Sequence, residues 1–139
     1  MKSTTYIKTM FFLGLAGFLF SGYLSAVKLF TSTCAFNSPC PYFLGYPACW
    51  YGFTMFTLIF AASIRGWCKN ACLKKANKMI TIISGLGVLF SGYFTLPEIE
   101  RMFSPAPQSL PLCAFGLVFY LLIFIFSVRY LATNKNLND

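Results

Sequence analysis

The sequence predicts an all-α membrane protein, a bundle of four transmembrane helices, and three observations support this class. The chain has 139 residues, of which 58% are hydrophobic and only 10% charged, whereas a soluble domain carries about 25% charged residues. Four apolar segments each approach the ~20 residues needed to cross a bilayer. The basic residues gather between these segments in the pattern that orients membrane helices. We expect a single domain over residues 1–139.

The four segments are predicted as helices at about 7–29, 47–66, 78–97 and 110–131. The first begins like a signal peptide, after Lys2 and Lys8, but its apolar run continues to Phe30. That run is too long for a cleaved segment, so we expect a retained helix. The second segment opens at Pro47, and proline suits the first turn of a helix because its missing N–H has no partner there. Cys49 is therefore expected in a first helical turn.

The basic residues predict the orientation of the helices. Nine of the eleven lie in the N-terminal tail, the 65–78 loop and the C-terminal end, and only Lys28 and Arg101 lie on the other side. The positive-inside rule then places both termini in the cytoplasm and the 30–46 and 98–109 loops outside. We expect a multi-pass protein of the plasma (inner) membrane with its cysteine-rich loop extracytoplasmic. The net charge of +8 is thus assigned to membrane orientation, and no nucleic-acid partner is expected.

The ionisable residues exclude several kinds of active site. The chain has no histidine, and its only acids are Glu98, Glu100 and Asp139. A paired-carboxylate hydrolase or a metal site of oxygen ligands is therefore disfavoured, and no phosphate-binding glycine loop is present. Cys68 and Cys72 lie four residues apart at the cytoplasmic face. Without a histidine or a second pair, they are expected to be free thiols, and no metal site is predicted.

Two short patterns occur twice in the chain. Phe-Ser-Gly-Tyr occurs at 20–23 and 90–93, and Pro-x-Cys-x-aromatic-Gly occurs at 47–52 and 111–116. The first helix therefore matches the third and the second matches the fourth, which predicts two parallel two-helix repeats. A pseudo-twofold axis along the membrane normal would bring Cys49 and Cys113 to face each other. A shared helix-start rule would explain the proline and glycine, but not the cysteine at the same position twice.

The cysteines at the outer face are candidates for redox chemistry. They are Cys34, Cys40, Cys49 and Cys113. Disulfides persist there in an oxidising compartment, and the Asn-Ser-Pro sequence between the first two permits a tight turn that a disulfide would close. At the start of a helix, the partial positive charge lowers the pKa of a thiol such as that of Cys49. The alternative is that Cys49 is an inert, buried, small hydrophobic residue.

Small residues predict where helices touch, because they allow close backbone approach in lipid, and we expect the first and third helices to cross closely. They are Gly14, Gly17, Ser21, Gly85, Gly87 and Ser91. The same repeat alignment places Lys28 opposite Glu98. We expect these two charges to lie within reach of each other, since pairing relieves the cost of a charge near the membrane. The alternative is that each extends separately to water.

Several segments resemble vitamin K epoxide reductases and their bacterial relatives. Residues 21–28 (Ser-Gly-Tyr-Leu-Ser-Ala-Val-Lys) look like the end of their first helix, and the Cys34…Cys40 pair resembles their loop cysteines. Residues 43–47 (Phe-Leu-Gly-Tyr-Pro) look like the entry to their second helix, and residues 91–93 (Ser-Gly-Tyr) resemble the start of the second half. The resemblance covers roughly residues 14 to 130.

This resemblance implies a four-helix bundle around a quinone. Two loop cysteines would pass electrons from substrate thiols to a Cys-x-x-Cys pair that opens the fourth helix and reduces the quinone. The usual bacterial partner is a thioredoxin-like extracytoplasmic protein. Here the fourth helix has only Cys113, with Gly116 or Leu110 at the other position of the pair. Either the enzyme is degenerate, or Cys49 replaces the missing cysteine, a substitution that the family pattern does not supply.

The sequence therefore predicts a vitamin K epoxide reductase-like membrane thiol–disulfide oxidoreductase that passes electrons from extracytoplasmic thiols to a quinone. The expected catalytic residues are Cys34, Cys40, Cys49 and Cys113, and the aromatic residues expected against the quinone are Trp50, Tyr51 and Phe115. The alternative is a non-catalytic four-helix membrane protein with structural disulfides that binds lipid or a membrane partner. A transporter is disfavoured, because the candidate intramembrane charges, Lys28 and Glu98, both lie near the outer end.

Overall fold

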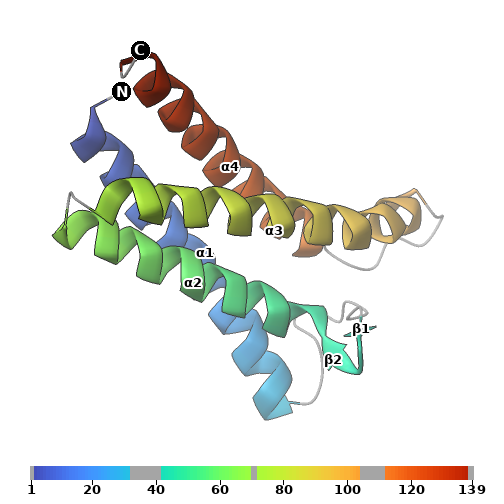
Figure 1. Ribbon diagram of the computed structural model, residues 1–139. Helices are drawn as coiled ribbons and strands as arrows, with labels where there is room; N and C mark the ends of the chain where they lie inside the picture. The colour runs from blue at the N-terminus through green and yellow to red at the C-terminus, as the bar shows by residue number, and fades with distance from the viewer. Residues whose placement is uncertain (1, 32–41, 70–71, 104–111, 138–139) are drawn as a thin grey trace.

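Four long helices form the protein, with one small hairpin before the second helix (Figure 1). The computed structural model describes residues 2–31, 42–69, 72–103 and 112–137. The helices are α1 (Ser3–Thr31), α2 (Ala48–Cys68), α3 (Leu73–Met102) and α4 (Leu112–Leu137), and the strands are β1 (Tyr42–Phe43) and β2 (Tyr46–Pro47). All four helices are long and apolar enough to cross a membrane. The predicted class, an all-α protein with four candidate transmembrane helices, is confirmed.

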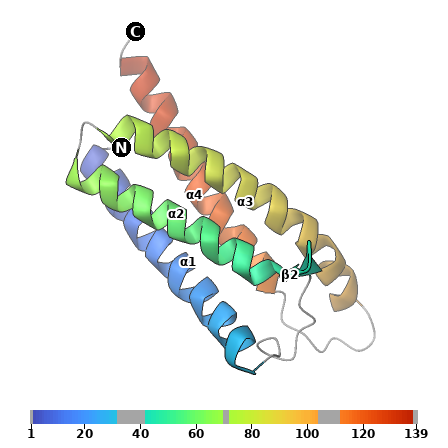
Figure 2. The same ribbon diagram turned by 60° about the horizontal axis from the view of Figure 1, so that its bottom comes forward.

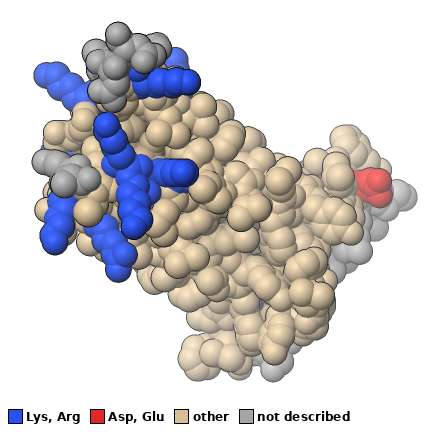
Figure 3. Space-filling model, viewed as in Figure 1, with Lys and Arg blue, Asp and Glu red and all other residues tan. Residues whose placement is uncertain are grey.

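The helices run alternately in opposite directions. α2 packs against α1 and α3, and α4 packs mainly against α3 and less extensively against α1. The beginning of α1, the end of α4 and the junction between α2 and α3 lie at one end of the molecule, as Figures 1 and 2 show. The hairpin, the end of α3 and the beginning of α4 lie toward the other end. The lysine and arginine side chains gather at the first end (Figure 3).

The third helix is longer than predicted at both ends. It begins at Leu73 and continues through Pro97 to Met102, whereas the sequence predicted its end at 97. The backbone N–H of Phe103 donates to the carbonyl of Ile99 at 3.3 Å, so the helical hydrogen-bond pattern resumes beyond the proline. A proline removes one hydrogen bond of a helix, and membrane helices tolerate this loss. Glu98, which was expected in a loop, therefore lies on α3.

The hairpin before α2 was not predicted. Tyr42 pairs with Pro47 and Phe43 with Tyr46, which leaves a two-residue turn. Both turn residues have positive φ, 52° at Leu44 and 85° at Gly45, as a type I′ turn requires. Pro47 ends β2 and is the N-cap of α2, one position earlier than expected. Cys49 lies in the first turn of α2, as predicted.

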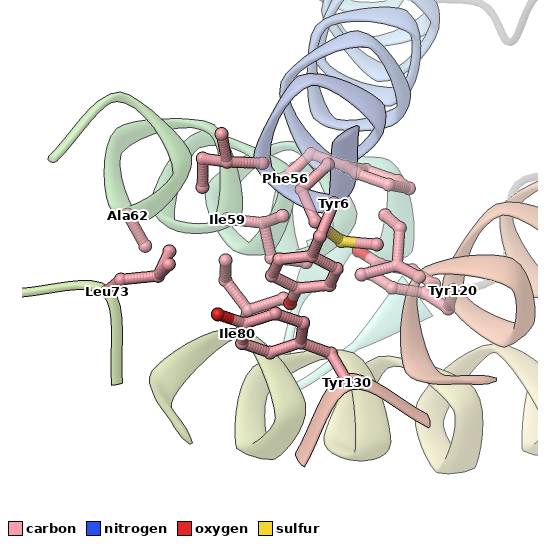
Figure 4. Packing of buried hydrophobic residues seen from close by; sticks show 11 residues of the cluster. Tyr6, Phe56, Ile59, Ala62, Leu73, Ile80, Tyr120 and Tyr130 are labelled. Carbon is pink, nitrogen blue, oxygen red and sulfur yellow. The ribbon is translucent and has the colours of Figure 1, made fainter. Parts of the chain in front are cut away.

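The main core lies toward the basic end and in the middle of the bundle (Figure 4). It consists of Tyr6, Ile7, Met10, Phe56, Ile59, Ala62, Leu73, Ile80, Tyr120, Ile123 and Tyr130. The rings of Tyr6 and Tyr130 stack with centroids 4.1 Å apart, which joins the beginning of α1 to the end of α4. Many large apolar side chains on the outer faces, such as Phe12 and Leu89, are exposed. Such a surface suits contact with lipid.

The small residues of α1 and α3 mark helix contacts, as predicted, but the contacts are with α2 and α4. The close crossing expected between α1 and α3 is not found among the described residues, because α1 packs mainly against α2, and α3 against α2 and α4. A side-chain carbon at Gly17 would meet the ring of Phe56 on α2, and one at Gly87 would meet the ring of Tyr120 on α4. Gly14 likewise faces α2, and Gly85 faces α4. The buried positions of α1 at 14, 17, 21 and 24 correspond to buried positions of α3 at 84, 87, 91 and 94. The two helices therefore present similar surfaces to the interior, 70 positions apart in the chain.

Candidate functional site: a cavity that contains two thiols

Cys49 and Cys113 each occupy the second position of their helix, which places both at the end of the bundle away from the termini. They are 64 positions apart in the sequence, yet they line the same cavity. Both are half-buried thiols without a disulfide bond. The structure therefore brings together two of the four cysteines that the sequence nominated.

Side chains from all four helices enclose the cavity. Its lining consists of Phe20, Ser21, Leu24, Ala48, Cys49, Gly52, Phe56, Phe90, Ser91, Phe94, Cys113, Gly116 and Tyr120. The volume is ≈ 60 Å³, whereas one water requires roughly 10–15 Å³ on such a scale. The walls are mostly aromatic and aliphatic. The cavity therefore offers an apolar space of limited size beside the two cysteines, smaller than the roughly 150 Å³ cavity that accepts benzene.

Glu98 holds the first turn of α4 at the position of Cys113. Its carboxylate oxygens accept the backbone N–H of Cys113 at 3.2 and 3.4 Å. The thiol of Cys113 lies close enough to the same carboxylate to feel its charge. The first N–H groups of a helix have no partner within it, and a negative charge there is favourable. Glu98 thus satisfies one of these donors and is placed to exchange a proton with the thiol.

The surroundings of Cys49 differ from those of Cys113. The hydroxyl of Ser25 donates to the carbonyl of Cys49 at 3.3 Å. The ammonium group of Lys28 donates to the hydroxyl of Tyr42 at 2.8 Å and lies 5.3 Å from the centre of its ring. The charges of Lys28 and Glu98 both act on the thiol of Cys49. Both charges therefore lie near the same thiol. The ion pair expected between Lys28 and Glu98 stays a prediction.

The other predicted cysteines have different outcomes. Cys34 and Cys40, with the disulfide predicted between them, lie outside the described residues. Cys68 and Cys72 are exposed free thiols. Cys68 ends α2, in whose first turn Cys49 lies, and Cys72 directly precedes α3, so both lie at the opposite end of the bundle from the cavity. Among the described residues, no group of three or more metal-ligating side chains comes together.

The aromatic residues chosen from the sequence as quinone contacts do not line this cavity. Trp50 is 37% exposed and packs beside the ring of Tyr46. Tyr51 turns toward the hairpin, where its hydroxyl donates to the carbonyl of Phe43 at 3.1 Å. Phe115 is 48% exposed.

The aromatic residues that do line the cavity are Phe20, Phe56, Phe90, Phe94 and Tyr120. The sequence contains a pattern that could have identified Phe56 and Tyr120. Gly52 and Phe56 follow Cys49 at i+3 and i+7, and Gly116 and Tyr120 follow Cys113 at the same spacing. Residues at this spacing share one face of a helix. The hydroxyl of Tyr120 also donates to the carbonyl of Gly52 at 3.1 Å, which joins α4 to α2 below the thiols.

Searches for related proteins return no match. No protein-family model, no curated protein and no solved structure is significantly similar to this chain.

Proposed function

We propose that the chain is a membrane thiol–disulfide oxidoreductase similar to vitamin K epoxide reductases, and that Cys49 and Cys113 are its thiol pair within the membrane. One observation carries the proposal: two cysteines from matching positions of two different helices line a single apolar cavity. Structural cysteines are usually buried in the core and inert. These two instead lie half-buried at the wall of a cavity, where a disulfide could form and be reduced again.

A two-helix repeat accounts for this arrangement. In this proposal α1–α2 and α3–α4 are parallel repeats around a pseudo-twofold axis along the membrane normal. The matching buried positions of α1 and α3 support it, as does the contact of the rings of Phe56 and Tyr120 between the halves. The positive-inside rule places the basic end and both termini in the cytoplasm. The cavity then opens toward the extracytoplasmic side of the plasma (inner) membrane.

The proposed reaction passes two electrons from loop thiols to the cavity. A thiolate of Cys34 or Cys40 attacks the Cys49–Cys113 disulfide, forms a mixed disulfide and releases one cavity thiolate. The second loop thiolate then attacks the loop sulfur of the mixed disulfide and releases the other cavity thiolate. The loop pair is oxidised, the cavity pair is reduced, and an extracytoplasmic thioredoxin-like protein would reduce the loop again.

Glu98 is the proposed proton acceptor for Cys113. When the cavity disulfide is formed again, each thiol must lose one proton. The carboxylate already accepts the backbone N–H of this residue at 3.2 Å, so it lies beside the thiol without any rearrangement of the backbone. A carboxylate within hydrogen-bond reach of the proton meets the first requirement for a general base.

The aromatic lining suits the faces of a quinone ring, but the cavity of ≈ 60 Å³ is smaller than the roughly 150 Å³ that accepts benzene, so a ring would enter only if the walls moved apart. The aromatic faces of Phe20, Phe90 and Phe94 and the ring of Tyr120 would hold it beside the two thiols. When bound, a quinone supplies an acceptor for two electrons and two protons. The protein's contribution is to exclude water with apolar walls and to keep the two sulfur atoms at the same wall.

Controlled oxidation tests the cavity pair. The Cys68→Ser/Cys72→Ser protein, purified in detergent, is treated with diamide and analysed by peptide mass spectrometry without reductant. We expect a Cys49–Cys113 cross-link, and the further variant Cys113→Ser should abolish it and leave Cys49 open to alkylation. Two freely alkylated thiols after oxidation in the parent protein would contradict the proposal.

Trapping separates the enzyme from the non-catalytic alternative. Cys34→Ala and Cys40→Ala variants, each lacking one loop thiol, are isolated from oxidising cells by acid quenching and alkylation. We expect one of them to carry mixed disulfides with other proteins, because the remaining thiol cannot be resolved within the loop. The absence of adducts from both variants, together with a permanently oxidised cavity pair, would support a structural disulfide in a non-catalytic membrane protein.

A further inference from the structure

A second, larger pocket opens at the basic end of the bundle, between the beginnings of α1 and α3 and the end of α4. Its volume is ≈ 680 Å³, within the range of about 300–1,000 Å³ typical of ligand sites. The polar residues on which the argument rests are Ser3, Thr4, Lys74, Asn77, Tyr130 and Lys135. None of the described residues that line the pocket is acidic.

The electrostatics of this pocket favour an anion. Lys74 and Lys135 supply two positive charges from different helices. Ser3 and Thr4 lie in the first turn of α1 and Lys74 in the first turn of α3, and neither first turn contains an acidic residue. The first N–H groups of a helix are unpaired within it and carry partial positive charge. Two helix beginnings and two ammonium groups therefore converge on one pocket.

The side chain of Asn77 gives independent evidence of a missing partner. Its exposed fraction is 0%, and it is among the residues that line the pocket. Its carbonyl oxygen accepts hydrogen bonds from the hydroxyls of Tyr6 and Ser127. Its amide nitrogen is buried and has no hydrogen-bond partner among the described residues. Leaving a buried donor unpaired is costly, so this nitrogen can donate to an acceptor of a ligand once the side chains that cover it move aside.

We propose that this pocket binds the phosphate group of an anionic phospholipid. α1 has 29 residues and is about 43 Å long at ~1.5 Å per residue, whereas the hydrocarbon core of a bilayer is ~30 Å thick. Its first turn therefore reaches the headgroup region. Leu73 and Leu131 add apolar surface to the lining, which suits the glycerol and upper acyl chain of a lipid. Basic pockets between transmembrane helices are typical sites for acidic headgroups.

The test measures binding of short-chain phosphatidylglycerol to the purified full chain in detergent. The test variant is Lys74→Gln/Lys135→Gln. The matched control is Lys75→Gln/Lys78→Gln, which removes the same charge from exposed positions of α3 outside the lining. We expect the test variant to raise Kd about thirtyfold, because it loses the attraction of two lysine charges for the anionic headgroup. The control should change Kd much less. All four lysines are exposed, so both variants should unfold at the wild-type temperature without lipid.

Two further ligands identify the source of the phosphate. Inorganic phosphate should bind far more weakly than phosphatidylglycerol, because it lacks the apolar contacts. Equally tight binding of inorganic phosphate would mean a free-anion site and overturn the lipid assignment. Short-chain phosphatidylcholine should bind weakly, because its headgroup carries a compensating positive charge. Equal binding of phosphatidylcholine, or an equal loss of affinity in the control variant, would overturn the proposal as well.

Discussion

The ring of Phe56 stacks on the ring of Tyr120, with centroids 4.3 Å apart and planes inclined by 13°. The two residues lie seven positions after Cys49 and Cys113, respectively. Each ring also covers a glycine of the helix before it, Phe56 over Gly17 and Tyr120 over Gly87. Because both rings also line the thiol cavity, this stack holds all four helices together beside the candidate site.

The first prediction concerns the glycines beneath the stack. A side-chain carbon at Gly87 would overlap the ring of Tyr120, and one at Gly17 would overlap the ring of Phe56. We expect Gly17→Ala and Gly87→Ala each to lower the free energy of unfolding by about 1–3 kcal/mol, the usual cost of overpacking. Thermal unfolding in detergent measures the effect.

Gly92→Ala is the matched control for this prediction. It lies on α3 as Gly87 does, but no atom lies within 4 Å of a carbon added there. Since alanine favours helix more than glycine does, this variant should unfold at the wild-type temperature or above it. If Gly87→Ala behaved like Gly92→Ala, the close contact between α3 and Tyr120 would not exist.

The second prediction concerns the buried polar contacts among α1, α3 and α4. The hydroxyl of Ser127 donates to the side-chain carbonyl of Asn77 at 2.7 Å and also contacts the hydroxyl of Thr81. We expect Ser127→Ala to destabilise the protein by about 0.6–2 kcal/mol, the range for hydrogen bonds between membrane helices. Thr133→Ala on the same helix is the control, since its hydroxyl is exposed and bonds only to the backbone carbonyl of Arg129. Chemical unfolding of both variants measures the difference.

The helices could be predicted from the sequence because length and apolar composition decide whether a segment can cross a membrane. Their ends could not. α3 passes through Pro97, and a proline reads as a helix end in the sequence even where neighbouring helices stabilise the chain beyond it. The hairpin was missed because its turn places Leu44 at positive φ. Leucine rarely adopts this conformation, so its presence does not predict such a turn.

The candidate site could be predicted only in part. The repeated Pro-x-Cys pattern identified the two cysteines that share a cavity. The aromatic contacts were chosen by nearness in sequence, yet Trp50 and Tyr51 lie one and two positions after Cys49. Successive residues of a helix are rotated by about 100°, so these positions do not share a face with the cysteine. The contact of Glu98 with Cys113 was not foreseeable, because it requires α3 to continue beyond Pro97.

The third prediction concerns the two ends of the bundle. Cys68 and Cys72 are exposed at the end of α2 and just before α3, whereas Cys49 and Cys113 are half-buried at the beginnings of α2 and α4, toward the other end of the bundle. If the basic end is cytoplasmic, a membrane-impermeant maleimide should label Cys68 and Cys72 in inside-out vesicles and not in right-side-out vesicles. Cys68→Ser and Cys72→Ser identify the contribution of each thiol. Labelling of these two cysteines in intact right-side-out vesicles would reverse the proposed orientation.

The last prediction tests whether Lys28 and Glu98 interact. Lys28 contacts Tyr42, Glu98 accepts the N–H of Cys113, and both charges act on Cys49. Glu98→Gln alone should cost about 0.3–1 kcal/mol of stability, because a negative charge at the beginning of α4 is lost. Lys28→Met should cost less in the Glu98→Gln background than in the wild type, because its charged partner is then absent. Glu100→Gln is the control, since this neighbouring carboxylate is exposed on the same helix.

A double-mutant cycle on unfolding free energy measures this coupling. Residues that interact show coupling energies of about 0.5 kcal/mol or more, whereas independent sites add within roughly 0.3–0.5 kcal/mol. We expect coupling between Lys28 and Glu98, and none between Lys28 and Glu100. A pair of opposite charges at the end of the bundle near the thiol cavity would hold α1 to α3 at positions 70 residues apart in the chain. If the losses of unfolding free energy from Lys28→Met and Glu98→Gln simply add, the two side chains do not interact. In that case α1 and α3 are aligned by packing alone.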